Sequence, residues 1–187
     1  MDGGGTATGK RGMRVCFHGA ESTGKSTLAR KLAAELGCPL VGEYGRTYAE
    51  TIDTNFRMSD LTAIAARQNR MMREACAGDP PLVLLDTDPL MTAAWAEMLF
   101  GHAPDVLFGY DKAECYLLFE PDVPFVADGT RFFGGDAERA RFAALAEDML
   151  VRAGVGFVRI GGRWEKREEK ARAAINAALA NVGSGGA

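Results

Sequence analysis

The segment HGAESTGKSTLARKLA, residues 18–33, constrains the fold of this chain more than any other feature. It contains the pattern G-x-x-x-x-G-K-[ST] in full. The apolar run at 13–18 before it predicts a strand, and the leucine spacing over 25–36 after it predicts a helix. A strand, a glycine loop and a helix in this order are the context that a phosphate-binding P-loop requires. The alternative is a plain glycine turn capped by Ser22 or Thr23.

The residue types of this loop predict its chemistry. Glycines let the backbone approach a phosphate closely, successive N–H groups point at the anion, and the helix N-terminus adds partial positive charge. Lys25 is expected to reach the β- and γ-phosphates of ATP, and the Ser26 hydroxyl is expected to bind Mg²⁺. The predicted ATP-binding residues form one continuous stretch: Gly19, Ala20, Glu21, Ser22, Thr23, Gly24, Lys25, Ser26 and Thr27.

Strand-like and helix-like segments alternate along the rest of the chain. Short apolar runs bounded by turn residues are typical of buried parallel strands. They occur at 13–19, 38–44, 81–88, 113–121 and 155–162. Segments with helical spacing separate them, so we predict an α/β fold with a five-stranded parallel sheet and helices on both faces. We expect the folded domain to cover 13–182, with flexible tails at 1–12 and 183–187.

Composition argues against several classes of protein. The 22 Lys and Arg residues against 25 Asp and Glu give a net charge of −3, so nothing indicates a nucleic-acid or anionic-membrane binder. No apolar run approaches the roughly 18–20 residues of a membrane span. The four scattered cysteines form no C-x-x-C pair, which disfavours a zinc site or disulfide framework and fits reduced thiols. We therefore expect a cytoplasmic protein with a small-molecule partner. No feature predicts its oligomeric state.

Two carboxylates follow the apolar run at 81–88. Asp86 and Asp88 stand where a buried parallel strand ends, and open α/β sheets bind ligands at the carboxyl ends of their strands. Mg²⁺ takes few direct protein ligands and prefers oxygen, so Asp86 is a candidate for the metal site together with Ser26. Asp88 is a candidate for substrate binding. Alternatively, Asp88 caps a helix that begins at Pro89.

A second set of polar residues follows the strand-like run at 38–44. Glu43 ends that run, and a carboxylate within hydrogen-bond reach of an acceptor hydroxyl can take its proton. Glu43 and Asp86 are therefore the two candidates for a general base. Tyr44, Arg46 and Tyr48 are predicted to line the acceptor pocket with Glu43. The alternative is a surface ion pair between Arg46 and Glu43, with the tyrosines packed.

The segment 121–142 is rich in Pro, Gly, Asp and Arg and follows the fourth strand-like run. A lid that closes over nucleotide phosphates excludes water and brings an arginine to the transferring phosphoryl group. Arg131, between two glycine-containing turns, is the predicted lid arginine and a catalytic candidate. Asp128 is predicted to contact substrate. Arg139 and Arg141 either contribute to the lid or form a solvated helix face.

Four segments resemble the ribosylnicotinamide kinase domain of bacterial NadR-type proteins: GAESTGKSTL, EYGRTY, DTDPLMTAAW and PFVADGTRFFGG. They occur in the same order and spacing, and the resemblance covers about residues 13–180. It implies a P-loop kinase fold and the ATP- and Mg²⁺-dependent phosphorylation of nicotinamide riboside to nicotinamide mononucleotide in NAD salvage. It further implies that Asp86 and Asp88 serve the metal and the acceptor ribose, and that Arg131 serves the lid.

Two other functions remain open on the sequence. A P-loop kinase of the same fold can act on another nucleoside or a vitamin alcohol. A nucleotide-binding regulatory ATPase or switch is the third hypothesis. The chain has no N-K-x-D segment of the kind that reads guanine in GTPases, which counts against a GTP switch. An arginine-bearing lid favours a kinase, because a switch does not need one.

Overall fold

The computed structural model describes residues 12–52, 55–124 and 135–184. Its helices and strands are, in chain order, β1 (Met13–Gly19), α1 (Lys25–Leu36), β2 (Leu40–Val41), α2 (Tyr44–Thr51), α3 (Met58–Cys76), β3 (Leu82–Leu85), α4 (Pro89–Phe100), the 3₁₀ helix η1 (Asp105–Phe108), β4 (Cys115–Phe119), α5 (Asp136–Arg152), β5 (Phe157–Ile160) and α6 (Trp164–Ser184).

The five strands form one parallel sheet in the order β2-β3-β1-β4-β5. Strand β1 lies at its centre, pairing with β3 from Met13 to Cys16 and with β4 from Val15 to Gly19. From β1 the chain goes to β2 at one edge and returns to β3 beside β1, then crosses to the other side of β1 for β4 and β5. A parallel sheet opens a crevice at such a reversal, beyond the carboxyl ends of its strands.

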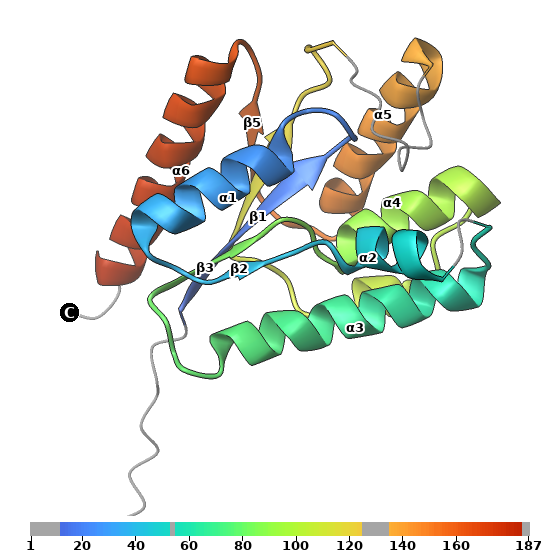
Figure 1. The fold of residues 1–187 in the computed structure, drawn as a ribbon, viewed down its shortest axis with the longest axis horizontal. Helices are drawn as coiled ribbons and strands as arrows, with labels where there is room; N and C mark the ends of the chain where they lie inside the picture. Colours follow the sequence, from blue (N-terminus) through green and yellow to red (C-terminus); the bar gives the residue numbers. More distant parts are fainter. Residues whose placement is uncertain (1–11, 53–54, 125–134, 185–187) are drawn as a thin grey trace, which may run out of the picture.

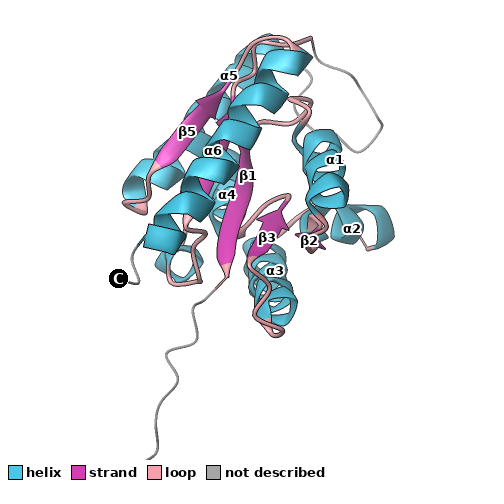
Figure 2. Ribbon diagram, turned by 90° about the vertical axis from the view of Figure 1, so that its left-hand side faces the viewer, coloured by secondary structure: helices cyan, strands magenta, loops and turns pink. Residues whose placement is uncertain are grey.

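Helices cover both faces of the sheet (Figures 1 and 2). Val15 and Phe17 of β1 pack in one core with Leu28 and Leu32 of α1 and with α6. The intervening side chains of β1 point to the opposite face, where α3, α4 and α5 supply the second core. Burial on both faces explains why the strands are continuous apolar runs. The predicted α/β fold with its five-stranded parallel sheet is confirmed.

The second strand is shorter than predicted. It covers Leu40–Val41, and helix α2 begins at Tyr44, where the sequence predicted that the strand continues. The ladder to β3 ends with the hydrogen bond from the Asp86 N–H to the Val41 carbonyl, 2.9 Å long. Beyond it the backbone turns into α2, so Glu43 stands before a helix and not in a strand.

The third strand also ends early, at Leu85. Pro89 occupies the first turn of α4, where its fixed φ is compatible with a helix, and Asp88 is the cap residue. The segment 86–88 therefore forms a short connection at the carboxyl edge of the sheet. Among the described residues, no helix is both long enough and apolar enough to cross a membrane.

Candidate functional site

The loop after β1 has the backbone shape that a P-loop needs. Gly19 and Gly24 have φ of 126° and 85°, and Ser22 has φ of 58°. A Cβ on Gly19 would lie 2.5 Å from the Phe119 carbonyl oxygen, so no larger residue fits there. Gly19 is therefore required both by its φ and by the close passage of β4.

Lys25 and Thr23 tie the loop together from inside. The Lys25 ammonium donates to the Ala20 carbonyl at 2.5 Å, and the Thr23 hydroxyl donates to the same oxygen at 2.9 Å. Burial lowers the pKa of Lys25, while the carboxylates of Glu43 and Asp86 oppose that shift. The lysine thus lies on the inner side of the loop with acidic groups facing it.

Two buried arginines hold the loop from outside. Arg167 of α6 is 1% exposed and donates to the Thr23 carbonyl at 3.1 Å, to the Glu120 carbonyl at 3.0 Å and to the carboxylate of Asp122. Arg139 of α5 is 6% exposed, so of the two alternatives the solvated face does not apply to it, although Arg141 is exposed. Arg139 donates to the Val123 carbonyl at 2.7 Å and approaches the Ser22 carbonyl at 3.5 Å.

A cleft runs from the P-loop across the carboxyl edge of the sheet. We call the part against the P-loop the P-loop half. It holds about 980 Å³ of empty space, solvent at its mouth included. Its lining comprises Gly19, Glu21, Ser22, Thr23, Gly24, Lys25, Ser26, Thr27, Arg30, Gly42, Glu43, Arg46, Asp86, Thr87, Met91, Trp95 and Phe142.

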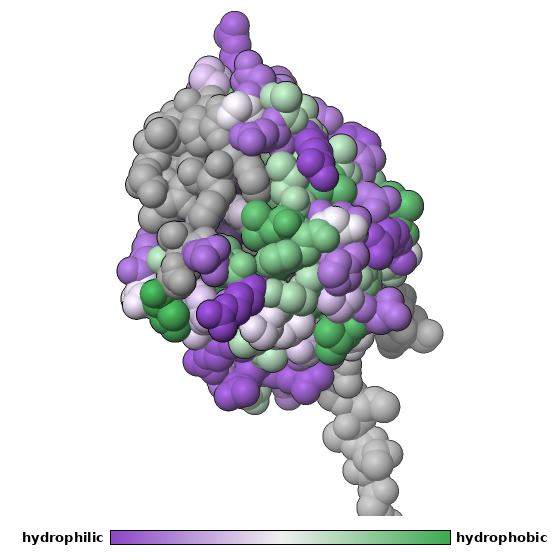
Figure 3. Space-filling model, turned by 90° about the vertical axis from the view of Figure 1, so that its right-hand side faces the viewer, coloured by the Kyte–Doolittle hydropathy of each residue, from purple (hydrophilic) through white to green (hydrophobic). Residues whose placement is uncertain are grey.

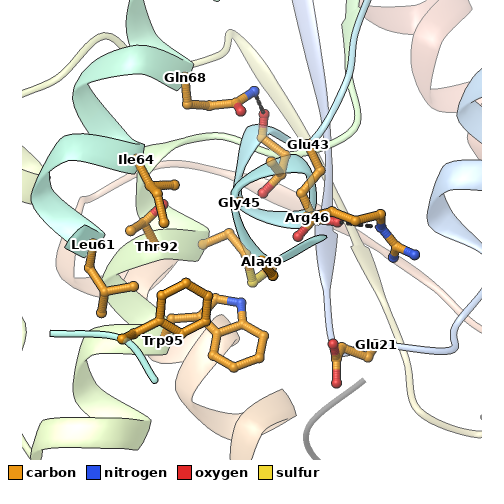
Figure 4. Close-up of a pocket in the computed structure, with 13 residues that line it drawn as sticks. Glu21, Glu43, Gly45, Arg46, Ala49, Leu61, Ile64, Gln68, Thr92 and Trp95 are labelled. Atoms are coloured by element: carbon orange, nitrogen blue, oxygen red, sulfur yellow. Dashed lines mark hydrogen bonds and ion pairs between the residues drawn. The ribbon is translucent and has the colours of Figure 1, made fainter. Parts of the chain in front are cut away.

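We call the adjoining part the apolar half; it holds about 580 Å³ on the same measure. Its lining comprises Glu21, Glu43, Gly45, Arg46, Ala49, Phe56, Leu61, Ile64, Gln68, Thr87, Met91, Thr92 and Trp95. Figure 4 shows Trp95, Leu61 and Ile64 on one side of this space and Glu43 with Arg46 on the other. In Figure 3, hydrophobic side chains gather at the centre of the face on the right of Figure 1, with hydrophilic ones around them.

The two halves share a boundary with a polar and an apolar part. Four polar residues line both halves, Glu21, Glu43, Arg46 and Thr87, and so do Met91 and Trp95. Arg46 Nε lies 3.5 Å from Glu43 Oε2 (Figure 4). Burial raises the pKa of Glu43, and the nearby charges of Lys25 and Arg46 partly oppose the increase. The structure therefore brings the predicted residues Lys25, Glu43 and Arg46 together.

Asp86 has the features of a cation ligand. Its side chain lies in the P-loop half, is 7% exposed, and its Oδ1 has no hydrogen-bond partner among the described residues. A buried carboxylate oxygen without a partner is costly unless a ligand satisfies it. Ser26 lines the same half. A carboxylate and a hydroxyl are oxygen donors of the kind that Mg²⁺ accepts, so these residues fit that ion.

Asp88 occupies a different environment. It is fully buried, accepts the Leu90 N–H at 3.1 Å as the cap of α4, and accepts the Tyr116 hydroxyl at 2.5 Å. Burial raises its pKa to about 6. Asp88 is not among the residues that line the cleft, so its contacts are those of the capping alternative.

A buried histidine faces Asp88. His18 Nδ1 lies 3.8 Å from Asp88 Oδ1, while Nε2 donates to the Ala146 carbonyl at 2.9 Å. Burial lowers the pKa of His18 to about 3. Cys16 completes a group whose potential ligand atoms lie within 4.8 Å of one another. Because both oxygens of Asp88 already accept hydrogen bonds, this group is a core network that links β1, α4 and α5 beneath the cleft.

Tyr44 and Tyr48, which were predicted to line the acceptor pocket, are not among the residues that line the cleft. Their rings pack edge to face with centroids 6.4 Å apart, and the Tyr48 hydroxyl donates to Asp60 at 3.0 Å. Asp128 and Arg131 lie outside the described residues, so their roles stay predictions.

Sequence reasoning missed most of the apolar half. Trp95 lies two turns into α4, on the same face as Met91. Helix α4 is apolar on nearly all sides, so its sequence carries no stripe that marks the face toward the cleft. In α3, Leu61, Ile64, Ala65, Met71 and Met72 form an apolar stripe whose one polar break is Gln68, and that break was the available signal.

Fold and cleft together define a P-loop nucleotide-binding domain with the fold of the P-loop kinases. The chain belongs to the family described as AAA domain, whose model matches residues 14–167. It is 30% identical over 153 residues to the trifunctional NAD biosynthesis/regulator protein NadR of Escherichia coli (strain K12), which covers 78% of this chain. The match takes in 37% of that protein, so the chain spans little more than a third of its length.

Solved structures show the same fold. NadR in complex with NR superposes with a TM-score of 0.78 at 24% identity, over 91% of this chain and 52% of that one. NadR in complex with NAD and AMP-PNP gives 0.71 at 24% identity, over 91% and 50%. Deoxyadenosine kinase from M. mycoides gives 0.62 at 10% identity, over 88% of this chain and 100% of that one. The resemblance noted in the sequence is thus confirmed for family and fold.

Proposed function

We propose that this protein is an ATP- and Mg²⁺-dependent kinase that phosphorylates nicotinamide riboside to nicotinamide mononucleotide, a step of NAD salvage in the cytoplasm. One observation carries the proposal. A P-loop and an apolar, aromatic pocket share a boundary that includes Glu43, Arg46 and Thr87. A hydroxyl held in the apolar half meets the γ-phosphoryl group of a nucleotide held by the P-loop at this boundary. Adjoining sites for donor and acceptor are what phosphoryl transfer requires.

The P-loop half binds the donor. The backbone N–H groups of residues 19–27 and the Lys25 ammonium bind the phosphates, and Lys25 offsets the negative charge that spreads over the γ-phosphoryl oxygens during transfer. Ser26 and Asp86 would hold Mg²⁺, and the bound ion would offset the negative charge that develops on the phosphates. The unpartnered Oδ1 of Asp86 supports this assignment.

Glu43 is the better candidate for the general base. It lines both halves of the cleft, whereas Asp86 lines only the P-loop half. In the transfer step, Glu43 accepts the proton of the acceptor hydroxyl, the hydroxyl oxygen bonds to the γ-phosphorus, and the bond from that phosphorus to the leaving ADP breaks. The raised pKa of Glu43 makes it a stronger base than an ordinary glutamate.

The chemistry of the apolar half fits a flat cation. The nicotinamide ring of nicotinamide riboside carries a positive charge, and the face of a tryptophan attracts cations more strongly than other aromatic faces do. Trp95 supplies such a face, and the carboxylates of Glu21 and Glu43 add negative charge at the boundary. NadR, to which this chain is similar, has been solved with NR bound, which supports the same acceptor.

A kinase for another nucleoside is the second candidate, favoured by the shared fold with deoxyadenosine kinase. A panel of acceptors decides between the two. Purified protein with ATP and Mg²⁺ is offered nicotinamide riboside, uridine, cytidine, adenosine and thiamine, and kcat/KM is measured for each. We expect nicotinamide riboside to lead. A higher value for any other acceptor overturns the assignment and keeps the reaction class.

A further inference from the structure

Gln68 of α3 joins the two loops that carry the candidate base and the candidate metal ligand. Its side chain is 1% exposed. The amide nitrogen donates to the Gly42 carbonyl at 3.1 Å and to the Thr87 carbonyl at 3.2 Å. The amide oxygen accepts the Tyr44 N–H at 2.9 Å. Figure 4 shows the amide reaching from α3 toward the loop of Glu43.

The hydrogen bonds of Gln68 lie just beyond the point where the backbone pairing of β2 and β3 ends. Strands β2 and β3 pair at Leu40 and Val41, and the last backbone bond between them comes from the Asp86 N–H. Beyond that bond, the Gln68 amide spans the two loops by donating to the Gly42 carbonyl on one and the Thr87 carbonyl on the other. Glu43 lies between two residues bound by Gln68, and Asp86 directly precedes a third.

Gln68 also fixes the start of α2. The Glu43 side chain makes no capping hydrogen bond, so the first N–H groups of the helix depend on other acceptors. The Tyr44 N–H is satisfied by Gln68. Helix α2 carries Arg46, so the position of this boundary residue also depends on the start of the helix.

We propose that Gln68 is a positioning residue for phosphoryl transfer: it sets the distance between Glu43 and Asp86 by bonding to the backbone of the two loops that carry them. The proposal rests on the proposed kinase function. Gln68 borders the apolar half, but both ends of its amide bond backbone groups, so its proposed action is through Glu43 and Asp86. Misplacing reacting groups by about 1 Å costs on the order of 100-fold in rate, so a link of this kind matters for catalysis.

The test compares two buried amides that are neighbours on α3. Gln68→Met keeps the length of the side chain and removes its three hydrogen bonds. Asn69→Leu is the matched control: Asn69 is 5% exposed and accepts the Asp111 N–H at 3.2 Å, away from the cleft. We expect Gln68→Met to lower kcat about 10- to 100-fold with little change in the KM for ATP, and Asn69→Leu to leave both unchanged.

The pH profile separates positioning from a loss of folded protein. In Gln68→Met, Glu43 is no longer held in place and is more exposed to water, so its pKa falls toward the ordinary value of glutamate. The rise of kcat with pH on the acidic side of the profile (the acidic limb) therefore shifts to lower pH. A merely structural role leaves that limb in place. Equal kcat and equal limbs in the two variants overturn the proposal. If Gln68→Met does not fold, Gln68→Asn, whose amide is one methylene too short to span the loops, takes its place with the same expectation.

Amide hydrogen exchange tests the link without any substrate. We expect the Tyr44 N–H to exchange faster in the Gln68 variant and at the wild-type rate in Asn69→Leu. Equal exchange in all three proteins overturns the link. If the wild-type protein phosphorylates no acceptor, the proposed function fails, and this measurement still decides whether Gln68 holds the two loops.

Discussion

The two halves of the cleft are built in different ways. The P-loop half takes eight of its 17 lining residues from one continuous segment, residues 19–27, whose shape follows from positive φ at Gly19 and Gly24 and from the helix after it. The apolar half is assembled from α2, α3, α4 and the loop after β3. The first half can therefore be recognised in any chain with the motif, whereas the second exists only once the fold has formed.

The difference extends to chemistry. Under the proposed function, the backbone N–H groups, Lys25 and Asp86 of the P-loop half would contact what every donor nucleotide shares. Trp95, Phe56 and their apolar neighbours would contact what distinguishes one acceptor from another. Changes in the P-loop half should therefore lower the rate for all acceptors alike, and changes in the apolar half should alter their ranking.

The largest effect is expected at Lys25. Lys25→Ala removes the cation on the transferring phosphoryl group, and comparable charges in related chemistry contribute ~10³–10⁵ in rate. We expect kcat to fall on that scale for every acceptor, with the fold intact by circular dichroism. Lys31→Ala is the control, because Lys31 lies on the same helix but pairs with Glu168 at 2.6 Å on the surface. Normal turnover by Lys25→Ala contradicts the ATP site.

Removal of the base is expected to come next. Glu43→Gln should lower kcat by ~10²–10⁴ for all acceptors. In the wild type, kcat should rise with pH through a pKa above the ordinary value of glutamate, because the base acts when deprotonated and burial raises its pKa. That limb should vanish in Glu43→Gln. Asp86→Asn should instead raise the Mg²⁺ concentration needed for half-maximal rate. A near-normal kcat in Glu43→Gln would assign the proton to another group.

Trp95 tests the apolar half. Stacking of a flat ring on an aromatic side chain is worth about 1–3 kcal/mol, so Trp95→Ala should raise the KM for nicotinamide riboside about 10- to 100-fold. The ratio of kcat/KM for nicotinamide riboside to kcat/KM for uridine should fall in Trp95→Ala. Trp164 is the matched control: a Cβ on Gly24 would lie 3.0 Å from its ring, so it stands beside the P-loop, and it is not among the residues that line the apolar half. Trp164→Ala should leave the ranking of acceptors by kcat/KM unchanged. An unchanged ranking in Trp95→Ala would contradict the division of the cleft.

The sequence predicted the P-loop half better than the apolar half. The P-loop and the five strands are local features, and both were predicted. The cap role of Asp88 was one of two alternatives, because a carboxylate before Pro89 fits a cap and a ligand equally well. Gln68 contacts residues 19 to 26 positions away, so only the fold reveals what it binds. Tyr44 and Tyr48 stand one turn apart on α2, so their rings pack against each other. The sequence predicted a strand up to residue 44 and so did not predict this contact.

The smallest effect concerns the core network below both halves. His18 has a pKa of about 3 in the fold against 6.5 in an unfolded chain. Between these values only the unfolded chain binds the proton, so this contribution to stability is present above pH 6.5 and lost as pH falls. Asp88, with its pKa raised to about 6 from 3.8, acts in the opposite sense between those values, since there only the folded protein binds the proton.

Comparing variants isolates the histidine. Urea unfolding gives the difference in the free energy of unfolding between the wild type and His18→Gln. This difference should fall by about 2 kcal/mol from pH 7 to pH 5, because only the wild type must keep a histidine neutral that is protonated in its unfolded chain. His102→Gln, at the exposed histidine after α4, controls for the loss of an imidazole as such. A stability difference that does not change with pH for His18→Gln would show that the imidazole is not held neutral.

The coupling of the two halves is tested most directly by the stoichiometry of the reaction. ADP and nicotinamide mononucleotide are quantified together, by chromatography, after incubation with ATP and Mg²⁺ in the presence and absence of nicotinamide riboside. Transfer across a shared boundary predicts one ADP for each nicotinamide mononucleotide, and ADP release that depends on the acceptor. ADP release at the same rate without acceptor, and no phosphorylated product with it, would contradict a kinase and favour a nucleotide-hydrolysing regulator.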